Sequence, residues 1–230
     1  VFLRPLGLRL WYKIKSRNVS ASGMDMIAEL HNMGIELMVS VWPTVDKESE
    51  NYPEMLEKGY LIRCERGVQT AFEFLGNTMH FDATNPAARQ YVWSKAKKNY
   101  YDKGVHIFWL DEAEPEYNVY DFDNYRYYLG PNLKIGNLYP VKYAQGFYEG
   151  MQAAGQKNIV NLLRCAWAGS QKYGALVWSG DIASSFESMR NQLAAGLGQI
   201  SQIMDSVINI YSKADGNIDS FASSIICEIC

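Results

Sequence analysis

Apolar residues follow a helical period in some segments and form short, nearly continuous runs in others. They recur at helical spacing over 26–33, and Gly34 follows where a left-handed residue commonly ends a helix. The run 35–42 is short and almost wholly apolar, which is typical of a buried strand. Helices are also predicted at 52–58, 86–102, 140–154 and 184–197, and strands at 60–63, 69–74, 105–111, 158–164 and 175–178. Because strands alternate with helices, the pattern predicts a parallel sheet and an α/β fold.

Two connections in this pattern differ from simple loops. The chain makes a long excursion between Pro43 and Asn85, and excursions of this length usually carry function or cover a site. Asn85 and Pro86 then supply an N-cap and a first-turn proline for the next helix. The second connection, 117–137, is rich in tyrosine and turn residues and leads into the helix at 140–154.

The character of the sequence changes near both ends. Residues 1–22 contain basic residues and no acidic one, and regular amphipathic sequence starts near Gly23. After Leu197 the helical and strand periods are lost. These changes predict an N-terminal extension at 1–22, a central domain at 23–198 and a C-terminal tail at 199–230.

Composition and charge narrow the functional class. The chain has 230 residues, of which 48% are hydrophobic and 20% charged, and its formal net charge is −3. These values indicate a globular domain, and they give no reason to expect a nucleic acid or an anionic membrane as partner. No apolar run approaches the roughly 18 to 20 residues that span a bilayer, and the first residues lack a secretory pattern. We expect a soluble cytoplasmic protein.

Motifs for metals, thiols and nucleotides are weak. Cys227 and Cys230 form a terminal C-x-x-C, which we interpret as a loose tail rather than a redox or zinc site. The three histidines, His31, His80 and His106, lack the H-x-x-x-H spacing of zinc hydrolases. The chain also has no G-x-S-x-G, G-x-G-x-x-G or P-loop motif. We therefore predict no metal and no cofactor.

The strand at 105–111 ends abruptly in carboxylates, with the sequence Asp-Glu-Ala-Glu-Pro-Glu over 111–116. In parallel barrels the carboxyl ends of the strands face the active site, so Asp111 is a catalytic candidate. Strand alternation places Trp109 and Asp111 on one side and Leu110 on the other. From the residues alone, a solvated acidic loop or a metal site remains an equal alternative.

A second carboxylate, Asp181, follows the predicted strand at 175–178, with Ser179 and Gly180 leaving room for a ligand. Its alternative role is N-cap of the following helix. Arg164 ends the strand at 158–164, where an arginine can clamp a ligand or form a surface ion pair.

Several tryptophans are predicted near strand ends. Indole faces pack well on the C–H faces of pyranose rings, so aromatic residues beside two carboxylates suggest sugar chemistry. Each tryptophan taken singly is more often a core residue, and it is their shared location near strand ends that favours sugar binding. The residues concerned are Trp42, Trp109, Trp167 and Trp178.

Two long motifs resemble glycoside hydrolase family 31. The segment 109–115, Trp-Leu-Asp-Glu-Ala-Glu-Pro, resembles the family's nucleophile motif in the form of its α-xylosidase-like members. The segments 164–174 and 178–181 resemble the stretch that leads to the family's acid/base. The resemblance extends over about 23–197 and includes Phe-Asp-Ala-Thr-Asn-Pro at 81–86.

The resemblance implies a role for each candidate. Asp111 would be the nucleophile and Asp181 the general acid/base of a retaining hydrolase, whose two carboxyl groups lie about 5 to 5.5 Å apart. Arg164 would bind sugar hydroxyls, help keep a carboxylate ionised, and lie within hydrogen-bond distance of one of the two aspartates. The tryptophans at 42, 109 and 167 would line the sugar subsite, and Trp178 precedes the acid/base.

The resemblance also implies a (β/α)₈ barrel. Such a barrel takes about 250 residues, so we expect a partial barrel, truncated at both ends, with 1–22 and 199–230 foreign to the family. The predicted substrate is an α-linked xyloside or glucoside, and oligomers are possible in a full-length enzyme. The alternative is a catalytically inactive fragment that at most binds sugar, because missing strands leave open sheet edges.

Overall fold

A computed structural model describes residues 2–3, 21–64, 70–71, 77–114, 124–178 and 180–197 of the chain. The chain divides into two compact units, Val1–Gly180 and Asp181–Cys230, and each is described by itself. The tail at 199–230, with Cys227 and Cys230, lies outside the described residues, as does most of 1–22.

The first unit is built on a five-stranded parallel sheet with the strand order β1-β2-β7-β10-β11. The parallel sheet and the α/β class are thereby confirmed. Most strands are shorter than the predicted apolar runs, because only their central residues pair with a neighbouring strand. Their bounds are Phe2–Leu3 for β1, Met38–Val41 for β2, Ile107–Leu110 for β7, Asn161–Leu163 for β10 and Ala175–Val177 for β11.

The helices of this unit begin and end near the predicted residues because local signals set their ends. Asn85 Oδ1 accepts a hydrogen bond from the Ala87 N–H at 3.0 Å, and Pro86 is the first residue of α3. Gly104, with φ of 99°, ends the 3₁₀ turn after α3. The helices are α1 (Ala21–Asn32), α2 (Tyr52–Glu57), α3 (Pro86–Asn99), α4 (Asn132–Ile135) and α5 (Tyr139–Ala153), with 3₁₀ turns at Tyr101–Lys103, Gly136–Leu138 and Ser170–Tyr173.

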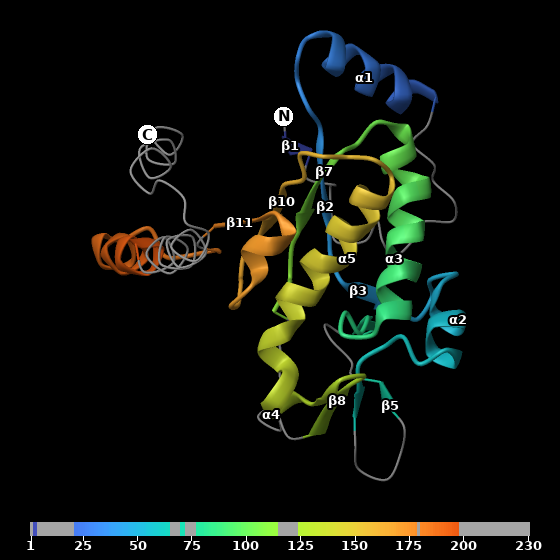
Figure 1. Ribbon diagram of the computed structural model, residues 1–230, viewed down its shortest axis with the longest axis vertical. Helices are drawn as coiled ribbons and strands as arrows, with labels where there is room; N and C mark the ends of the chain where they lie inside the picture. The colour runs from blue at the N-terminus through green and yellow to red at the C-terminus, as the bar shows by residue number, and fades with distance from the viewer. Residues whose placement is uncertain are drawn as a thin grey trace, which may run out of the picture. The chain divides into compact units, whose positions relative to one another are not determined.

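Helices α3 and α5 lie side by side and cover one face of the sheet (Figure 1). Three rings join these layers, with centroid distances of 5.2 Å for Phe108–Phe147, 5.7 Å for Trp93–Phe147 and 6.2 Å for Trp93–Phe108. Gly150 lets the helices approach, because a Cβ there would overlap the Trp93 indole ring. The core therefore lies between β7 and these two helices.

The connections after β2 and β7 form two small antiparallel sheets. One of these sheets contains β5 and β8 and lies at the end of the unit opposite α1 (Figure 1). The segment 117–137, expected only to be turn-rich, contributes β8 and β9 because β8 pairs with β4, far away in sequence. Strands β3 (Thr44–Asp46) and β6 (Thr78–His80) form one sheet, and β5 (Thr70–Ala71), β4 (Arg63–Cys64), β8 (Tyr125–Tyr127) and β9 (Gly130–Pro131) form the other in that order.

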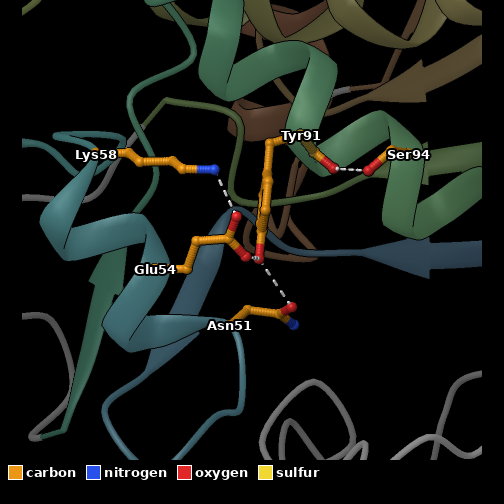
Figure 2. A network of polar contacts seen from close by, with 5 residues as sticks. All are labelled: Asn51, Glu54, Lys58, Tyr91 and Ser94. Atoms are coloured by element: carbon orange, nitrogen blue, oxygen red, sulfur yellow. Dashed lines mark hydrogen bonds and ion pairs between the residues drawn. The ribbon is translucent and has the colours of Figure 1, made fainter.

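A polar network joins α2 to α3 (Figure 2). The Tyr91 hydroxyl of α3 lies 2.8 Å from Glu54 Oε2 and 3.1 Å from Asn51 Oδ1. Lys58 Nζ donates to Glu54 Oε1 at 2.6 Å. Hydrogen bonds from Lys58 and Tyr91 lower the pKa of Glu54, so its carboxylate is ionised at neutral pH and anchors the excursion to the helical layer.

Buried Asp82 joins the excursion to the segment after β7. Its Oδ1 accepts hydrogen bonds from the Thr84 N–H and hydroxyl at 2.9 and 2.7 Å, and its Oδ2 accepts from the Tyr128 N–H at 2.5 Å. Burial raises the pKa of Asp82, and these hydrogen bonds oppose the rise. The Asp82–Tyr128 contact thus fixes the two long connections against each other.

In the second unit, residues 186–197 are helical, and the predicted helix at 184–197 is confirmed with a slightly later start. Ser185 Oγ accepts a hydrogen bond from the Ser188 N–H at 3.1 Å, which is N-cap geometry. Asp181 lies several residues before this helix begins. The N-cap is therefore Ser185, and the alternative role of Asp181 as N-cap is wrong.

Candidate functional site

Four adjacent strands end in register at the carboxyl edge of the sheet. Val41 pairs with Leu110, Leu110 with Leu163, and Leu163 with Val177. The next residue of each strand is therefore at the same level, and backbone hydrogen bonds continue there, from the Asp111 N–H to Val41 O at 3.0 Å and from the Trp178 N–H to Leu163 O at 3.1 Å. The four residues that follow the paired ends are Trp42, Asp111, Arg164 and Trp178.

The two faces of β7 differ as strand alternation predicts. Phe108 and Leu110 are fully buried, whereas Trp109 and Asp111 are partly exposed. The Trp109 ring meets the Trp178 ring edge to face, with centroids 5.3 Å apart. Asp111 therefore lies on the face opposite to the helices, beside an aromatic pair.

The Asp111 carboxylate is half-buried and surrounded by polar groups. Its Oδ1 accepts a hydrogen bond from the Glu112 N–H at 3.0 Å and lies 4.0 Å from Arg164 Nε. Burial raises the pKa of Asp111 above its ordinary value of 3.8. The Glu112 hydrogen bond, the Arg164 charge and a side-chain hydrogen bond with Trp42 oppose that rise. The site therefore holds a weakly solvated carboxyl group beside a permanent positive charge.

Arg164 binds two other carboxylates more closely than it binds Asp111. Its Nη2 donates to Glu112 Oε1 at 2.9 Å and also contacts Glu114 Oε1. Burial alone would lower the pKa of Arg164, but Glu114, Glu112 and Asp111 raise it overall. Arg164 Nε lies 4.0 Å from Asp111 Oδ1, while Nη2 binds the two glutamates. The expectation that Arg164 lies within hydrogen-bond distance of one of the two aspartates stays a prediction.

Glu112 and Glu114 are the site residues that sequence reasoning missed. Only 5% of the Glu112 side chain and 16% of the Arg164 side chain are exposed, so this part of the acidic segment is not a solvated loop. A signal was present, because a carboxylate on each side of Ala113, close to a strand end, needs a cation once buried. Among the described residues, no group of three or more potential ligands is arranged to hold a metal ion.

Two fully buried side chains lie close to this cluster. The Tyr143 hydroxyl of α5 donates to Val41 O at 3.0 Å, and burial together with the Asp111 charge raises its pKa. Burial and the Arg164 charge lower the pKa of His80 from 6.5 to about 3. His80 is therefore neutral at physiological pH and does not serve as a general acid.

The remaining predicted residues lie in different surroundings. Trp167 is 52% exposed, and its backbone N–H donates to Ser170 Oγ at 3.1 Å. Trp42 packs partly against the core, while Trp93, which the sequence did not mark as a candidate, is buried in the core. Asp181 belongs to the second unit, so its approach to Asp111 stays a prediction.

A pocket of about 470 Å³ lies at the opposite, amino edge of the sheet, lined among others by Glu36, His106 and Gln156. It contains neither the carboxylate cluster nor the tryptophan pair. We place the candidate site at the carboxyl edge, where acidic, cationic and aromatic groups converge.

Comparisons with known proteins agree with this arrangement. A family 31 glucosidase of Pseudescherichia vulneris is 63% identical over 75% of this chain and 32% of its own length. Alpha-xylosidase A of Aspergillus niger is 34% identical over 75% of this chain and 27% of its own length. A crystal structure of a family 31 α-xylosidase from a soil metagenome, complexed with xylose, is 70% identical with a TM-score of 0.72, covering 76% of this chain and 26% of that chain.

The chain thus spans about a quarter to a third of the length of these relatives. Within the described residues, no helix is both long and apolar enough to cross a membrane. The parallel sheet is part of a (β/α)₈ barrel like those of its structural relatives. The family model of the glycosyl hydrolases family 31 TIM-barrel domain matches residues 12–204, and the chain belongs to that family.

Proposed function

We propose that this chain carries the catalytic centre of a retaining glycosidase that cleaves α-linked xylosides or glucosides. The observation that supports it best is the in-register carboxyl edge, where Trp42, Asp111, Arg164 and Trp178 follow the last paired residues of four parallel strands. Relatives named α-xylosidase and glucosidase motivate both substrates.

In the first step, the Asp111 carboxylate attacks the anomeric carbon of the sugar. The bond from that carbon to the leaving oxygen breaks, and the oxygen takes a proton from the Asp181 carboxyl group. A covalent glycosyl ester on Asp111 results. The half-buried position of Asp111 suits this role, because a weakly solvated carboxylate loses little hydration on attack.

In the second step, water attacks the anomeric carbon and gives its proton to Asp181, and Asp111 leaves as a carboxylate. The two inversions at the anomeric carbon retain its configuration. Arg164 keeps positive charge near Asp111 throughout, since its pKa is raised by the surrounding carboxylates. We assign Trp109, Trp178 and Trp42 to the sugar subsite, with exposed Trp167 at its rim.

The test is hydrolysis of aryl α-xyloside and aryl α-glucoside by the full chain. Asp111→Asn should lower kcat by about 10⁴-fold or more, because it removes the nucleophile while keeping the shape of the side chain. Asp102→Asn is the matched control, since Asp102 is exposed and pairs with Lys97 far from the site. Binding of xylose without turnover by well-folded chain would instead support the inactive sugar-binding alternative.

Asp181 is tested separately through the leaving group. Asp181→Ala should slow cleavage of an alkyl xyloside, which needs protonation, far more than cleavage of a 4-nitrophenyl xyloside, which does not. Equal losses on both substrates would exclude Asp181 as the acid.

A further inference from the structure

Glu112 has a backbone conformation that side-chain residues rarely adopt. Its φ is +51°, and among the described residues it alone has a positive φ without being glycine. A left-handed conformation is unfavourable for an L-residue, because its Cβ comes too close to the following carbonyl oxygen. Such strain persists only when neighbouring contacts hold it. Here the Glu112 side chain is buried and binds Arg164 Nη2 at 2.9 Å.

This left-handed residue lies directly after the proposed nucleophile. The turn directs the Glu112 N–H at Asp111 Oδ1, 3.0 Å away. The chain then continues so that Glu114 also contacts Arg164. One guanidinium thus holds both carboxylates of the turn, and its Nε stays 4.0 Å from Asp111.

We propose that Glu112 is a positioning residue: its buried carboxylate anchors the left-handed turn to Arg164 and thereby keeps both the Glu112 N–H and the guanidinium directed at the Asp111 carboxylate. The inference rests on the proposed function, in which Asp111 is the nucleophile. The role requires the length and hydrogen-bonding capacity of the Glu112 side chain.

Every charged or titratable group facing Asp111 enters the test. Arg164 approaches from the end of β10, Glu112 and Glu114 from the turn itself, and Tyr143 from α5. Removing the Glu112 charge therefore changes the Asp111 pKa whether or not Glu112 positions anything. Only a comparison of variants with equal charge separates the effect of the lost charge from the effect of the lost anchor.

The first matched pair is Glu112→Gln and Glu112→Gly in the full chain. Glutamine keeps a hydrogen bond to Arg164, whereas glycine removes the anchor while relieving the strain of the positive φ. The readout is the Asp111 pKa from the ¹³C-carboxyl NMR signal, assigned by its absence in Asp111→Asn. We expect the Asp111 pKa to be about one unit higher in the glycine variant, a tenfold lower ratio of carboxylate to acid at a given low pH.

The second matched pair is the unmodified chain and Glu112→Asp, which carry the same charge and differ by one methylene. The shorter side chain does not reach Arg164 from the same backbone, so the Asp111 pKa should again rise. If the glycine variant does not fold, this pair alone tests whether Glu112 is a positioning residue. Equal Asp111 pKa values within both pairs would overturn the proposal. Because the titration needs no substrate, a chain without glycosidase activity would contradict the proposed function and leave this result intact.

Discussion

The two faces of β7 are adjacent along the chain and opposite in character. On the helical side, Phe108 and Leu110 are fully buried among apolar side chains of α3 and α5. On the other side, Trp109 meets an aromatic partner, and Asp111 lies among charged groups. A strand of four residues thus joins a packed core to the charged candidate site.

The difference teaches where the free energy of this fold is gained and where it is lost. The helical side gains stability from apolar burial and close packing, at about 25 cal/mol per Å² buried. The other side places Asp111, Glu112 and Glu114 around one arginine. Since burial raises the folded-state pKa of Asp111, its contribution to stability decreases as pH rises above the unfolded value of 3.8. The charged side depends on Arg164 for its stability.

Removing that cation should have the largest effect on stability. Arg164→Met keeps much of the apolar stem and leaves Glu112 and Glu114 without the guanidinium that binds them. We expect the free energy of unfolding to fall by about 4 kcal/mol at pH 7. The loss should shrink toward pH 5, because carboxylates without a cation partner take up protons there. Urea unfolding at both pH values measures it.

Arg190→Met is the control for this change, since Arg190 is exposed on the helix of the second unit. It should alter the free energy of unfolding by no more than about 0.5 kcal/mol. A loss of that small size for Arg164→Met as well would mean that the cluster is solvated in solution, and the contrast between the two faces of β7 would fail.

The second largest effect is the loss of stability at acid pH that buried His80 causes. Because its folded pKa is about 3 and its unfolded pKa 6.5, the unfolded chain binds the proton first as pH falls. The stability that neutral His80 supports is present above pH 6.5 and is lost below it, by about 2 kcal/mol between pH 6.5 and 4.5. His80→Gln should remove that part of the pH dependence in urea unfolding, whatever its effect at pH 7.

His106→Gln removes a partly exposed histidine at the amino edge of the sheet and serves as the control. The part of the pH dependence that comes from His80 should remain in this variant. The same dependence in His80→Gln would show that His80 is protonated in the folded protein, and the carboxyl edge would then be better solvated than the core beside it.

The sequence predicts best what local chemistry decides. Asn85 and Pro86 start α3 where expected, because an N-cap and its proline act within one turn. The alternation that buries Leu110 and exposes Trp109 depends only on the period of a strand. Four strand ends with candidate residues could therefore be identified without coordinates.

What the sequence could not predict depends on partners that are distant along the chain. In the sequence, Glu112 looks like any other residue of an acidic segment. It is buried in the fold because Arg164, from another strand, forms an ion pair with it. Strand β8 forms because β4 lies beside it, although its own segment is dominated by tyrosines and turn residues. The facing of Asp111 and Asp181 is a relation of the same distant kind and stays a prediction.

The smallest of these effects tests the apolar side of the comparison. Gly150→Ala adds one methyl group where α5 meets the Trp93 ring, so the indole or the helix has to move. Overpacking of this kind costs about 2 kcal/mol, more than the helix propensity gained on replacing glycine by alanine, which is roughly 1 kcal/mol. We expect a net loss of about 1 kcal/mol in the free energy of unfolding.

Gly196→Ala is the matched control, because Gly196 is also helical and nothing lies within 4 Å of a Cβ placed there. It should not destabilise its unit, since only the gain in helix propensity applies. If Gly150→Ala also stabilised the protein, the interface of α3 and α5 would have room for a methyl group, and close packing would not distinguish the helical face of β7. If only Gly150→Ala destabilises the protein, close packing determines which substitutions the helical face of β7 tolerates, whereas charge pairing does so on the other face.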